Sequence, residues 1–345
     1  MKKSRPIHLT FFVTRRCNQR CPFCFYLGVN DPQTPNLSPE ELGLPEIEKI
    51  SSSLGSLLWL AFSGGEVFLR DDIAEISRVF YKNNRPSIML YPTNGMQTEV
   101  IFEKISRILR DCPRSAVVVK LSMDGIGEKH DRIRGTHGSF ERLMKTYELL
   151  SRLLPRHPNF ELGINTVFLK DNQDDMREIA DFVKGLKGIK THTITLIRGT
   201  RKDVAPEKYL NAVEMLEKGL KDGTSAIYNF RGARLKAAQD ILQRRLIHKT
   251  MTKNRRMLPC HAGRLNLVLT ETGDVYPCES FTRRLGNVRG HNYDLKALLK
   301  TQRARASIAS ITEDKCFCTH ECYMMTNILF NPMTYPSLLR EYFQV

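Results

Sequence analysis

Three cysteines close to the amino terminus are the residues whose type and spacing most clearly indicate chemistry. Cys17, Cys21 and Cys24 lie directly after an apolar run at 8–13. Cysteine thiolate is the usual ligand of iron–sulfur clusters and a common ligand of zinc. Structural zinc requires four protein ligands, and no histidine near these cysteines supplies the fourth. A [4Fe–4S] cluster on three thiolates keeps one iron free, so the motif favours an iron–sulfur centre with an open site.

A second group of cysteines lies near the carboxyl terminus. Its members are Cys260, Cys278, Cys316, Cys318 and Cys322. Clustered cysteines in a chain without a signal peptide pattern favour metal binding over disulfides. We therefore expect a cytoplasmic protein with free thiols, and no membrane span because no run of about 18 apolar residues occurs. Cys112 stands apart, and we expect it to be a semi-buried thiol at a helix end.

A strand–helix alternation occupies the first two thirds of the chain and must position the first cysteines. Apolar runs predict strands at 8–14, 58–62, 87–91, 116–123, 160–168 and 191–197. Helical patterns are found near 39–54, 71–83, 99–111, 139–153, 173–186 and 206–220. Continuous apolar strands alternating with helices are typical of a covered parallel sheet. We expect an α/β fold, a partial (β/α)6 TIM-like barrel, with reactive groups on loops at the carboxyl ends of its strands.

The pattern changes after the sixth strand, and we expect three regions. Residues 1–225 form the barrel, residues 226–257 a basic helical linker, and residues 258–345 a small α+β cysteine-rich domain with a tail. Within the linker, 231–256 contains nine Lys or Arg and a single acid, Asp240. A solvated helix that bridges two domains is the favoured interpretation, and a docking face for an acidic partner is the alternative.

The overall charge is strongly basic. The formal net charge of +16 at pH 7 indicates an anionic partner, because net charge affects association rather than fold. We expect an acidic electron donor such as flavodoxin or ferredoxin to bind this surface. Nucleic acid is a weaker alternative, since the sequence contains no RNA-binding motif and only one Trp.

The motifs together resemble the radical S-adenosylmethionine (SAM) superfamily over roughly residues 6–225. Its members carry Cys-x3-Cys-x2-Cys after the first barrel strand, with an aromatic residue before the last cysteine, which Phe23 matches. They also carry a Gly-Gly-Glu element after the second strand. Gly64-Gly65-Glu66 matches it, although Val67 replaces the proline that often follows. The stretches 130–135 and 138–140 resemble the family as well.

This resemblance implies a cofactor site. The cluster would bind Cys17, Cys21 and Cys24, and the amino and carboxylate groups of SAM would chelate the open iron. The implied SAM-binding residues are Phe23, Gly64, Gly65, Glu66, Asn94, Ser122, Asp124, Arg134 and Asn165. Ser122 and Asp124 would bind the ribose hydroxyls and Arg134 the SAM carboxylate. No catalytic acid or base can be assigned.

The carboxyl-terminal cysteines resemble the SPASM and twitch domains that carry auxiliary clusters in one branch of the superfamily. Cys260, Gly273 and Cys278 match the opening of that pattern, with a hairpin at 264–277 and a helix at 295–308. The full SPASM pattern has seven cysteines for two clusters, and this region has five. We expect one auxiliary [4Fe–4S] cluster on Cys260, Cys278, Cys322 and one of Cys316 or Cys318, with structural zinc as the alternative.

The resemblance also implies the reaction. The reduced cluster would cleave SAM to a 5′-deoxyadenosyl radical that abstracts a hydrogen atom, and the auxiliary cluster would assist oxidation or binding. The expected substrate is a small molecule, sugar or lipid precursor, since the first strand begins by residue 8 and leaves no room for a preceding peptide-binding domain. The alternatives are a maturase that forms crosslinks or thioethers in ribosomal peptides, and a non-catalytic iron–sulfur electron carrier.

Overall fold

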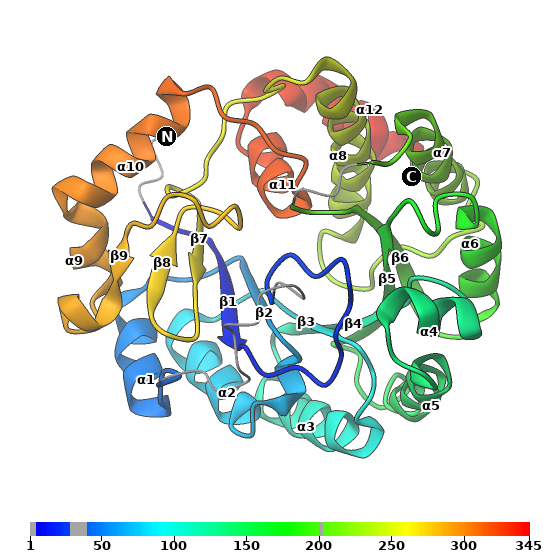
Figure 1. Cartoon of the computed structure of the whole chain (residues 1–345), viewed down its shortest axis with the longest axis horizontal. Coiled ribbons are helices and arrows are strands. Elements are labelled where there is room, and N and C mark those ends of the chain that lie inside the picture. Colours follow the sequence, from blue (N-terminus) through cyan, green and yellow to red (C-terminus); the bar gives the residue numbers. More distant parts are fainter. Residues whose placement is uncertain (1–4, 28–39, 200–202) are drawn as a thin grey trace.

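The computed structural model describes residues 5–27, 40–199 and 203–345, and over these residues the strands form one nine-stranded sheet. Its order is β6-β5-β4-β3-β2-β1-β7-β8-β9, and the first six strands are parallel. These six are β1 (His8–Thr14), β2 (Trp59–Gly64), β3 (Ile88–Thr93), β4 (Ala116–Ser122), β5 (Phe160–Phe168) and β6 (Ile189–Leu196). The expected parallel α/β barrel is confirmed (Figure 1).

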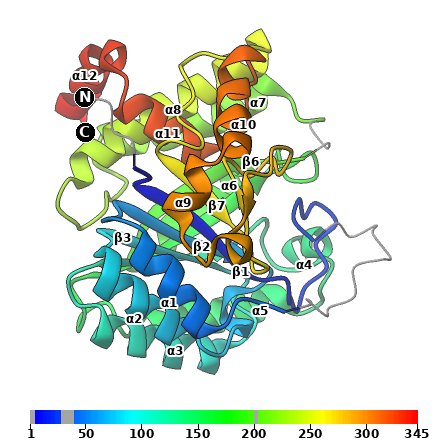
Figure 2. The ribbon, with the colours of Figure 1, turned by 90° about the vertical axis from the view of Figure 1, so that its left-hand side faces the viewer.

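Helices cover the outer face of the parallel strands (Figure 2). They are α1 (Leu44–Ser53), α2 (Ile73–Asn84), α3 (Thr98–Asp111), α4 (Glu128–Arg134), α5 (Ser139–Ser151), α6 (Met176–Gly185) and α7 (Pro206–Lys221). The short helix α4 was not predicted, and residue 39, where the first helix was expected to begin, lies outside the described residues. Cys112 is fully buried directly after α3, rather than semi-buried.

The continuous apolar strands are explained by burial on both faces. Leu9, Phe11 and Val13 of β1 point outward into the main core beneath the helices. On the inner face, a second apolar cluster fills part of the barrel. It consists of Trp59, Ala61, Ile88, Ala116, Val118 and Met325. Both faces of the sheet are therefore removed from water, as is usual for parallel strands.

The carboxyl-terminal region continues the barrel sheet. Strand β7 (Asn266–Leu269) pairs in parallel with β1, and β8 (Asp274–Tyr276) and β9 (Gly286–Asn287) follow in antiparallel order. The expected hairpin is confirmed, with Gly273 at φ +86° in its turn, a conformation that favours glycine. The two regions share one sheet, and the division at residue 258 stays a prediction.

The carboxyl-terminal helices differ from expectation. The single helix expected at 295–308 is two helices, α9 (Leu295–Lys300) and α10 (Gln302–Glu313). Thr301 separates them because its backbone is extended and its Oγ1 accepts from Ala304 N, 3.2 Å away, which caps α10. Helices α11 (Glu321–Leu329) and α12 (Tyr335–Gln344) were not predicted.

The basic segment forms the expected helix, α8 (Ala233–Lys253), and its role as a linker stays a prediction. Its buried residues include Ala238 and Leu242, but also Gln239, Gln243 and Arg244. Together with α11, it occupies the side of the ring between β7 and β6 (Figure 1). Among the described helices, none combines the length and apolar character needed to cross a bilayer.

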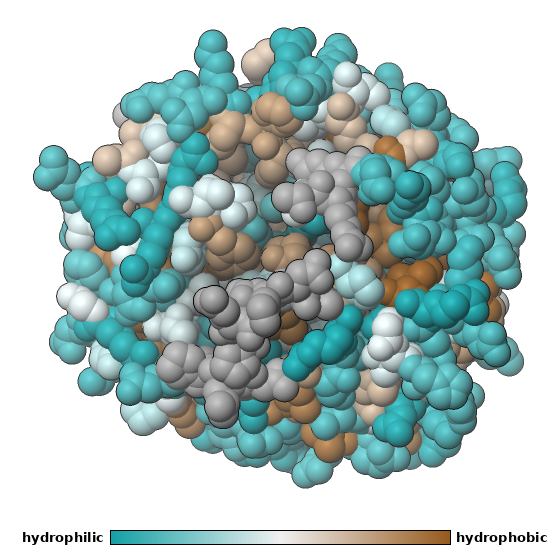
Figure 3. Space-filling view, in the orientation of Figure 1, coloured by the Kyte–Doolittle hydropathy of each residue, from teal (hydrophilic) through white to brown (hydrophobic). Residues whose placement is uncertain are grey.

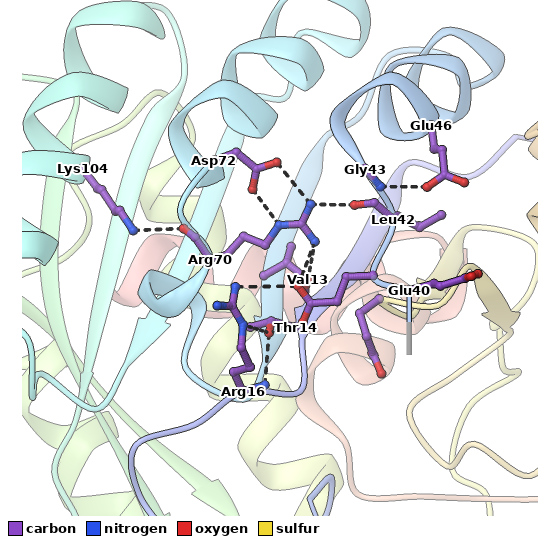
Figure 4. A network of polar contacts seen from close by, with 12 residues as sticks. Val13, Thr14, Arg16, Glu40, Leu42, Gly43, Glu46, Arg70, Asp72 and Lys104 are labelled. Carbon is purple, nitrogen blue, oxygen red and sulfur yellow. Dashed lines mark hydrogen bonds and ion pairs between the residues drawn. The ribbon is translucent and has the colours of Figure 1, made fainter. Parts of the chain in front are cut away.

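Arg70 anchors the start of the cysteine loop from the helical side (Figure 4). Its guanidinium donates to Val13 O at 3.0 Å and Leu42 O at 2.6 Å, and it pairs with Asp72 at 2.7 Å. Lys104 Nζ donates to the carbonyl oxygen of Arg70 itself, 3.0 Å away. Arg70 is 5% exposed, so these carbonyl groups depend on it rather than on water.

Replacing Arg70 by methionine should lower the free energy of unfolding by about 2–3 kcal/mol, because two buried carbonyl groups lose a charged donor. Urea unfolding followed by circular dichroism measures the change. Arg107→Met is the matched control, since Arg107 is partly exposed and pairs with Glu75 on the helical surface. Equal stability of the two variants would contradict the anchoring role of Arg70.

Candidate functional site

The first three cysteines lie on a compact loop at the carboxyl end of β1. Cys24 N donates to Cys21 O at 3.0 Å, and the backbone N of Leu27 donates to Cys24 Sγ at 3.4 Å. Burial raises the pKa of Cys17 to about 11, and it also raises the pKa of Cys21. Without a cation the thiols of Cys17 and Cys21 therefore stay protonated at neutral pH, whereas a bound metal centre would deprotonate them.

Gly64 and Gly65 allow the β2 loop to pack against the chain that leads into the cysteine loop. Gly65 N donates to Thr14 O, and Glu66 N donates to Arg16 O, both at 2.8 Å. A Cβ atom on Gly65 would overlap with Arg16 O and lie 2.9 Å from Arg15 O. Gly64, at φ +127°, faces Thr14 in the same way. These glycines thus fix the cysteine loop through its backbone.

Gly65→Ala should therefore displace the cysteine loop and reduce the iron bound by anaerobically reconstituted protein by about half, since the carboxyl-terminal cysteines lie elsewhere. Colorimetric iron analysis and the absorbance of the clusters measure the loss. Gly138→Ala is the control, because a Cβ atom there meets nothing within 4 Å, although its φ of +72° costs some stability. Full iron content in the Gly65 variant would refute this positioning.

Glu66 connects the β2 and β3 loops. It is 2% exposed and accepts from Thr93 Oγ1 at 2.7 Å and from Asn94 N at 2.8 Å. Asn94 in turn donates from Nδ2 to Asn18 Oδ1 of the cysteine loop, 2.7 Å away. Burial raises the pKa of Glu66, and these hydrogen bonds oppose the rise. Glu66 thereby holds Asn94 against the loop that carries the thiols.

Arg134 and Asp124 form a buried pair next to the same loop. Arg134 donates to Asp124 Oδ2 at 2.7 Å, to Gln19 Oε1 at 2.9 Å and to Ser122 O at 3.4 Å. Asp124 is 0% exposed, and its other oxygen accepts from Val167 N at 2.7 Å. Burial raises the pKa of Asp124, and Arg134 opposes that rise. In this arrangement Asp124 orients Arg134, and its predicted contact with the ribose stays a prediction.

One cavity of about 370 Å³ joins the cysteine loop to the interior of the barrel. Figure 3 shows this face hollowed near its centre. Cys17, Cys21 and Cys24 line the cavity. The other predicted SAM-binding residues that line it are Phe23, Gly64, Gly65, Glu66, Asn94, Ser122, Arg134 and Asn165. Asp124 is absent from the described lining. The cavity extends to Cys322, so the first thiols and one carboxyl-terminal thiol border the same space.

The carboxyl-terminal cysteines gather around Tyr323. Cys260, Cys278, Cys316 and Cys322 contact a small buried cluster formed by Ala262, Ile311 and Tyr323. Burial raises the pKa of Cys318 to about 12, and the charges of Cys260 and Cys278 contribute to that rise. All nine cysteines are free thiols. Within the described ranges, no three His, Cys, Asp or Glu side chains converge closely enough to hold a single metal ion.

A buried ion-pair network between the two cysteine groups was not predicted. Arg198, after β6, pairs with Glu279 and with Glu321 Oε2, the latter at 3.3 Å. Glu321 also accepts from Leu196 N at 3.1 Å. All three side chains line the barrel cavity. The sequence feature that could have revealed this network is the position of its two acids. Glu279 directly follows Cys278, and Glu321 directly precedes Cys322.

The sequence profile of the radical SAM superfamily matches residues 11–183, which is half of the 345 residues. The chain belongs to the radical SAM superfamily. It is 28% identical over 299 residues to the subtilosin biosynthesis protein AlbA of Bacillus subtilis, covering 84% of this chain and 59% of AlbA. It is 27% identical over 303 residues to the AdoMet-dependent heme synthase of Methanosarcina barkeri, covering 82% of this chain and 80% of the synthase.

Solved radical SAM structures share the fold. SuiB of Streptococcus suis, solved with S-adenosylmethionine, superposes with a TM-score of 0.61 at 15% identity over 89% of this chain and 68% of SuiB. The protein anSMEcpe, solved with AdoMet, superposes with a TM-score of 0.59 at 16% identity, over 98% of this chain and 93% of anSMEcpe. These structures confirm the expected fold, and the match to the superfamily profile confirms the expected enzyme class.

The residues around the cysteine loop fit the cofactors of a radical SAM enzyme, a [4Fe–4S] cluster and SAM. Three thiols come from one loop and border one cavity, which matches a cluster with a single open iron. The buried Nε2 of Gln19 has no hydrogen-bond partner among the described residues, so a donor remains available beside Cys21. The assignment of individual residues to the groups of SAM stays a prediction, as does the choice between Cys316 and Cys318.

Proposed function

We propose that this radical SAM enzyme takes a hydrogen atom from a substrate held inside the barrel. The observation that carries the proposal is the cavity of about 370 Å³, which is lined by Cys17, Cys21 and Cys24 at one side and by Cys322 at another. Small-molecule sites occupy about 300–1,000 Å³. A substrate in this space would lie between the SAM site and the carboxyl-terminal cysteines.

The chain contributes binding, orientation and exclusion of water. Bound at the cysteine loop, the cluster and SAM supply a 5′-deoxyadenosyl radical that can take hydrogen from an unactivated C–H bond. Arg134, held by Asp124 and Gln19, offers its guanidinium at the cavity wall, and Ser122 offers a hydroxyl. The apolar cluster around Trp59 and Met325 closes the inner side and limits access of water.

A small molecule remains the leading substrate class, because the cavity volume suits one. Peptide maturation is the second candidate, favoured by the similarity to AlbA over 84% of this chain. Anaerobic protein, SAM and dithionite should yield 5′-deoxyadenosine, and a substrate should raise that yield above the uncoupled rate. A cell extract divided by ultrafiltration into small molecules and peptides distinguishes the classes by which fraction raises it. No 5′-deoxyadenosine from protein with full iron content would refute the proposal and favour an electron carrier.

The cytoplasmic location and the acidic electron donor, a flavodoxin or ferredoxin, also stay predictions. The donor is supported by the net charge of +16. Docking between opposite charges weakens as salt screens them, so reduction by flavodoxin should slow as ionic strength rises. Stopped-flow reduction at increasing salt measures this, and a rate independent of salt would contradict the docking.

A further inference from the structure

A second cavity, of about 340 Å³, opens beside the edge strand of the barrel. It lies between β6, α6, α7, α8 and the loop that precedes α8. The lining residues that matter are Lys184, Lys187, Lys190, Thr191, His192 and Arg244. No residue of the predicted SAM or cluster sites lines it, so the cavity is separate from the cysteine loop.

Arg244 is the most unusual residue of this cavity. It is 9% exposed, and its Nη1 atom has no hydrogen-bond partner. No carboxylate in the described parts of the chain pairs with it, whereas the next residue, Arg245, pairs with Glu341 at 2.7 Å and with Glu217. A buried charge without a partner is costly, and a site that keeps one is suited to an anion that arrives from outside.

The surroundings of Arg244 are positive. Lys184 and Lys187 are exposed at the cavity, and Lys190 is partly exposed. Asp240 is the one acid among the described lining residues, and its charge is already paired with Lys236. Burial lowers the pKa of His192 to about 3, so its ring is neutral and adds no charge. Exposed lysines above a buried guanidinium attract and guide an anion.

The inner wall of this cavity is shared with the barrel. Thr193, Tyr228 and Asp240 line both cavities. On the barrel side of that wall, Lys120 of β4 donates to Thr191 and, at 3.2 Å, to Thr193 Oγ1, and no described carboxylate forms an ion pair with it. Thr193 keeps a hydroxyl proton that it can donate to an acceptor, whereas Thr191 also hydrogen-bonds Tyr228. A buried guanidinium and a buried amine therefore lie on opposite sides of a wall that contains the hydroxyl groups of these threonines.

Space for Lys120 is created by a glycine on the next strand. A Cβ atom on Gly163 would lie 2.7 Å from Lys120 Nζ and 2.8 Å from Thr191 O. Burial lowers the pKa of Lys120 to about 7. An anion nearby would stabilise its charged form, so the amine gains from an incoming acid as Arg244 does.

We propose that the cavity beside β6 binds the carboxylate of an organic acid through Arg244, with Lys120 as a second basic group on the barrel side of the shared wall. The inference goes beyond the proposed radical function and adds a second binding site, for an organic acid, outside the barrel cavity. A guanidinium matches a planar carboxylate with two parallel hydrogen bonds, and Leu216 and Leu220 in the same cavity suit the apolar part of the acid. The carboxylate can belong to a free acid or to a peptide.

The test measures binding to the full-length, anaerobically reconstituted protein by calorimetry. The probes are hexanoate, a hexapeptide with a free terminal carboxylate, the same peptide as its amide, and inorganic phosphate. Hexanoate or the free peptide should bind, and Arg244→Met should weaken binding at least about tenfold. Lys249→Gln, which removes an exposed charge from the same helix, should leave binding unchanged. Preference for hexanoate assigns a free acid, and preference for the free peptide over its amide assigns a peptide.

The stability of the variant separates a binding role from a structural one. Without ligand, Arg244→Met should melt at the same temperature as the wild type or about 2 °C higher, because it removes an unpaired buried charge. A lower melting temperature, binding of phosphate alone, or equal hexanoate affinity of variant and wild type would overturn the proposal. A wild type that cleaves SAM but binds no carboxylate refutes only this inference, and one that binds carboxylate but cleaves no SAM refutes only the proposed function.

Discussion

The Cys24→Ser protein should release at least about 100-fold less 5′-deoxyadenosine than the wild type when supplied with SAM and dithionite. Loss of even an outer partner of a metal ligand costs 10–100-fold, and Cys24 is predicted to be a direct ligand. Serine preserves the shape of the side chain but replaces the thiolate, so the loop should keep its backbone bonds while it loses the cluster. High-performance liquid chromatography of the nucleoside product measures the effect.

Iron content makes this prediction specific. The wild type should hold about eight irons, for two clusters, and the Cys24 variant about four, because the carboxyl-terminal cysteines are unchanged. Cys322→Ser should also hold less iron than the wild type, but it should continue to cleave SAM because the cluster at the first three cysteines is unchanged. Cys112→Ala is the control, since Cys112 is buried in the core away from both groups. A Cys24 variant that cleaves SAM normally, or a wild type with four irons, would contradict the two-cluster scheme.

Arg134→Met should have the largest effect on stability, about 3–5 kcal/mol at neutral pH. Asp124 is 0% exposed and pairs with Arg134 at 2.7 Å, so the variant leaves a buried carboxylate without its cation. SAM binding should weaken as well, because the predicted partner of the SAM carboxylate is removed. Urea unfolding and calorimetric titration with SAM measure the two effects.

The pH dependence of this variant has a definite sign. Burial already raises the pKa of Asp124 in the folded protein, and Arg134 opposes that rise. Without Arg134 the folded pKa rises further above the unfolded value of about 3.9. The unfolded state then releases its proton first, so the stability of the variant falls as pH increases above about 4. Adding Asp124→Asn should remove this dependence and recover stability, and a single variant with no pH dependence would falsify the pairing.

The barrel was predictable because local patterns specify it. Strand β4 is apolar on both faces, and the cysteines and Gly64-Gly65 follow strands directly. The extent of the packed surface of helix α8 could not be predicted from its apolar residues, because polar residues such as Gln239 and Arg244 are also buried. Lys120 was visible as a lysine within an apolar strand, yet its partners come from β6 and could not be identified from spacing.

The parts of the site that could not be predicted depend on contacts between residues far apart in the sequence. The partners of Asp124, namely Arg134 and Val167 N, are brought near only by the fold, and spacing could not identify them. The network of Arg198, Glu279 and Glu321 joins residues separated by up to 123 positions. Position next to a cysteine was the only sequence signal for these acids, and it could not indicate that they share one arginine.

The pairing of β7 with β1 also determines when the sheet can be completed during synthesis of the chain. His8 lies opposite Asn266, 258 residues further along the chain, so this contact raises the contact order and cannot form until most of the chain has been translated. Until then β1 has an open edge directly below the cysteine loop, and such edges promote aggregation. The cysteine loop therefore gains its second supporting strand only after β7 has been synthesised, when both neighbours of β1 are in place.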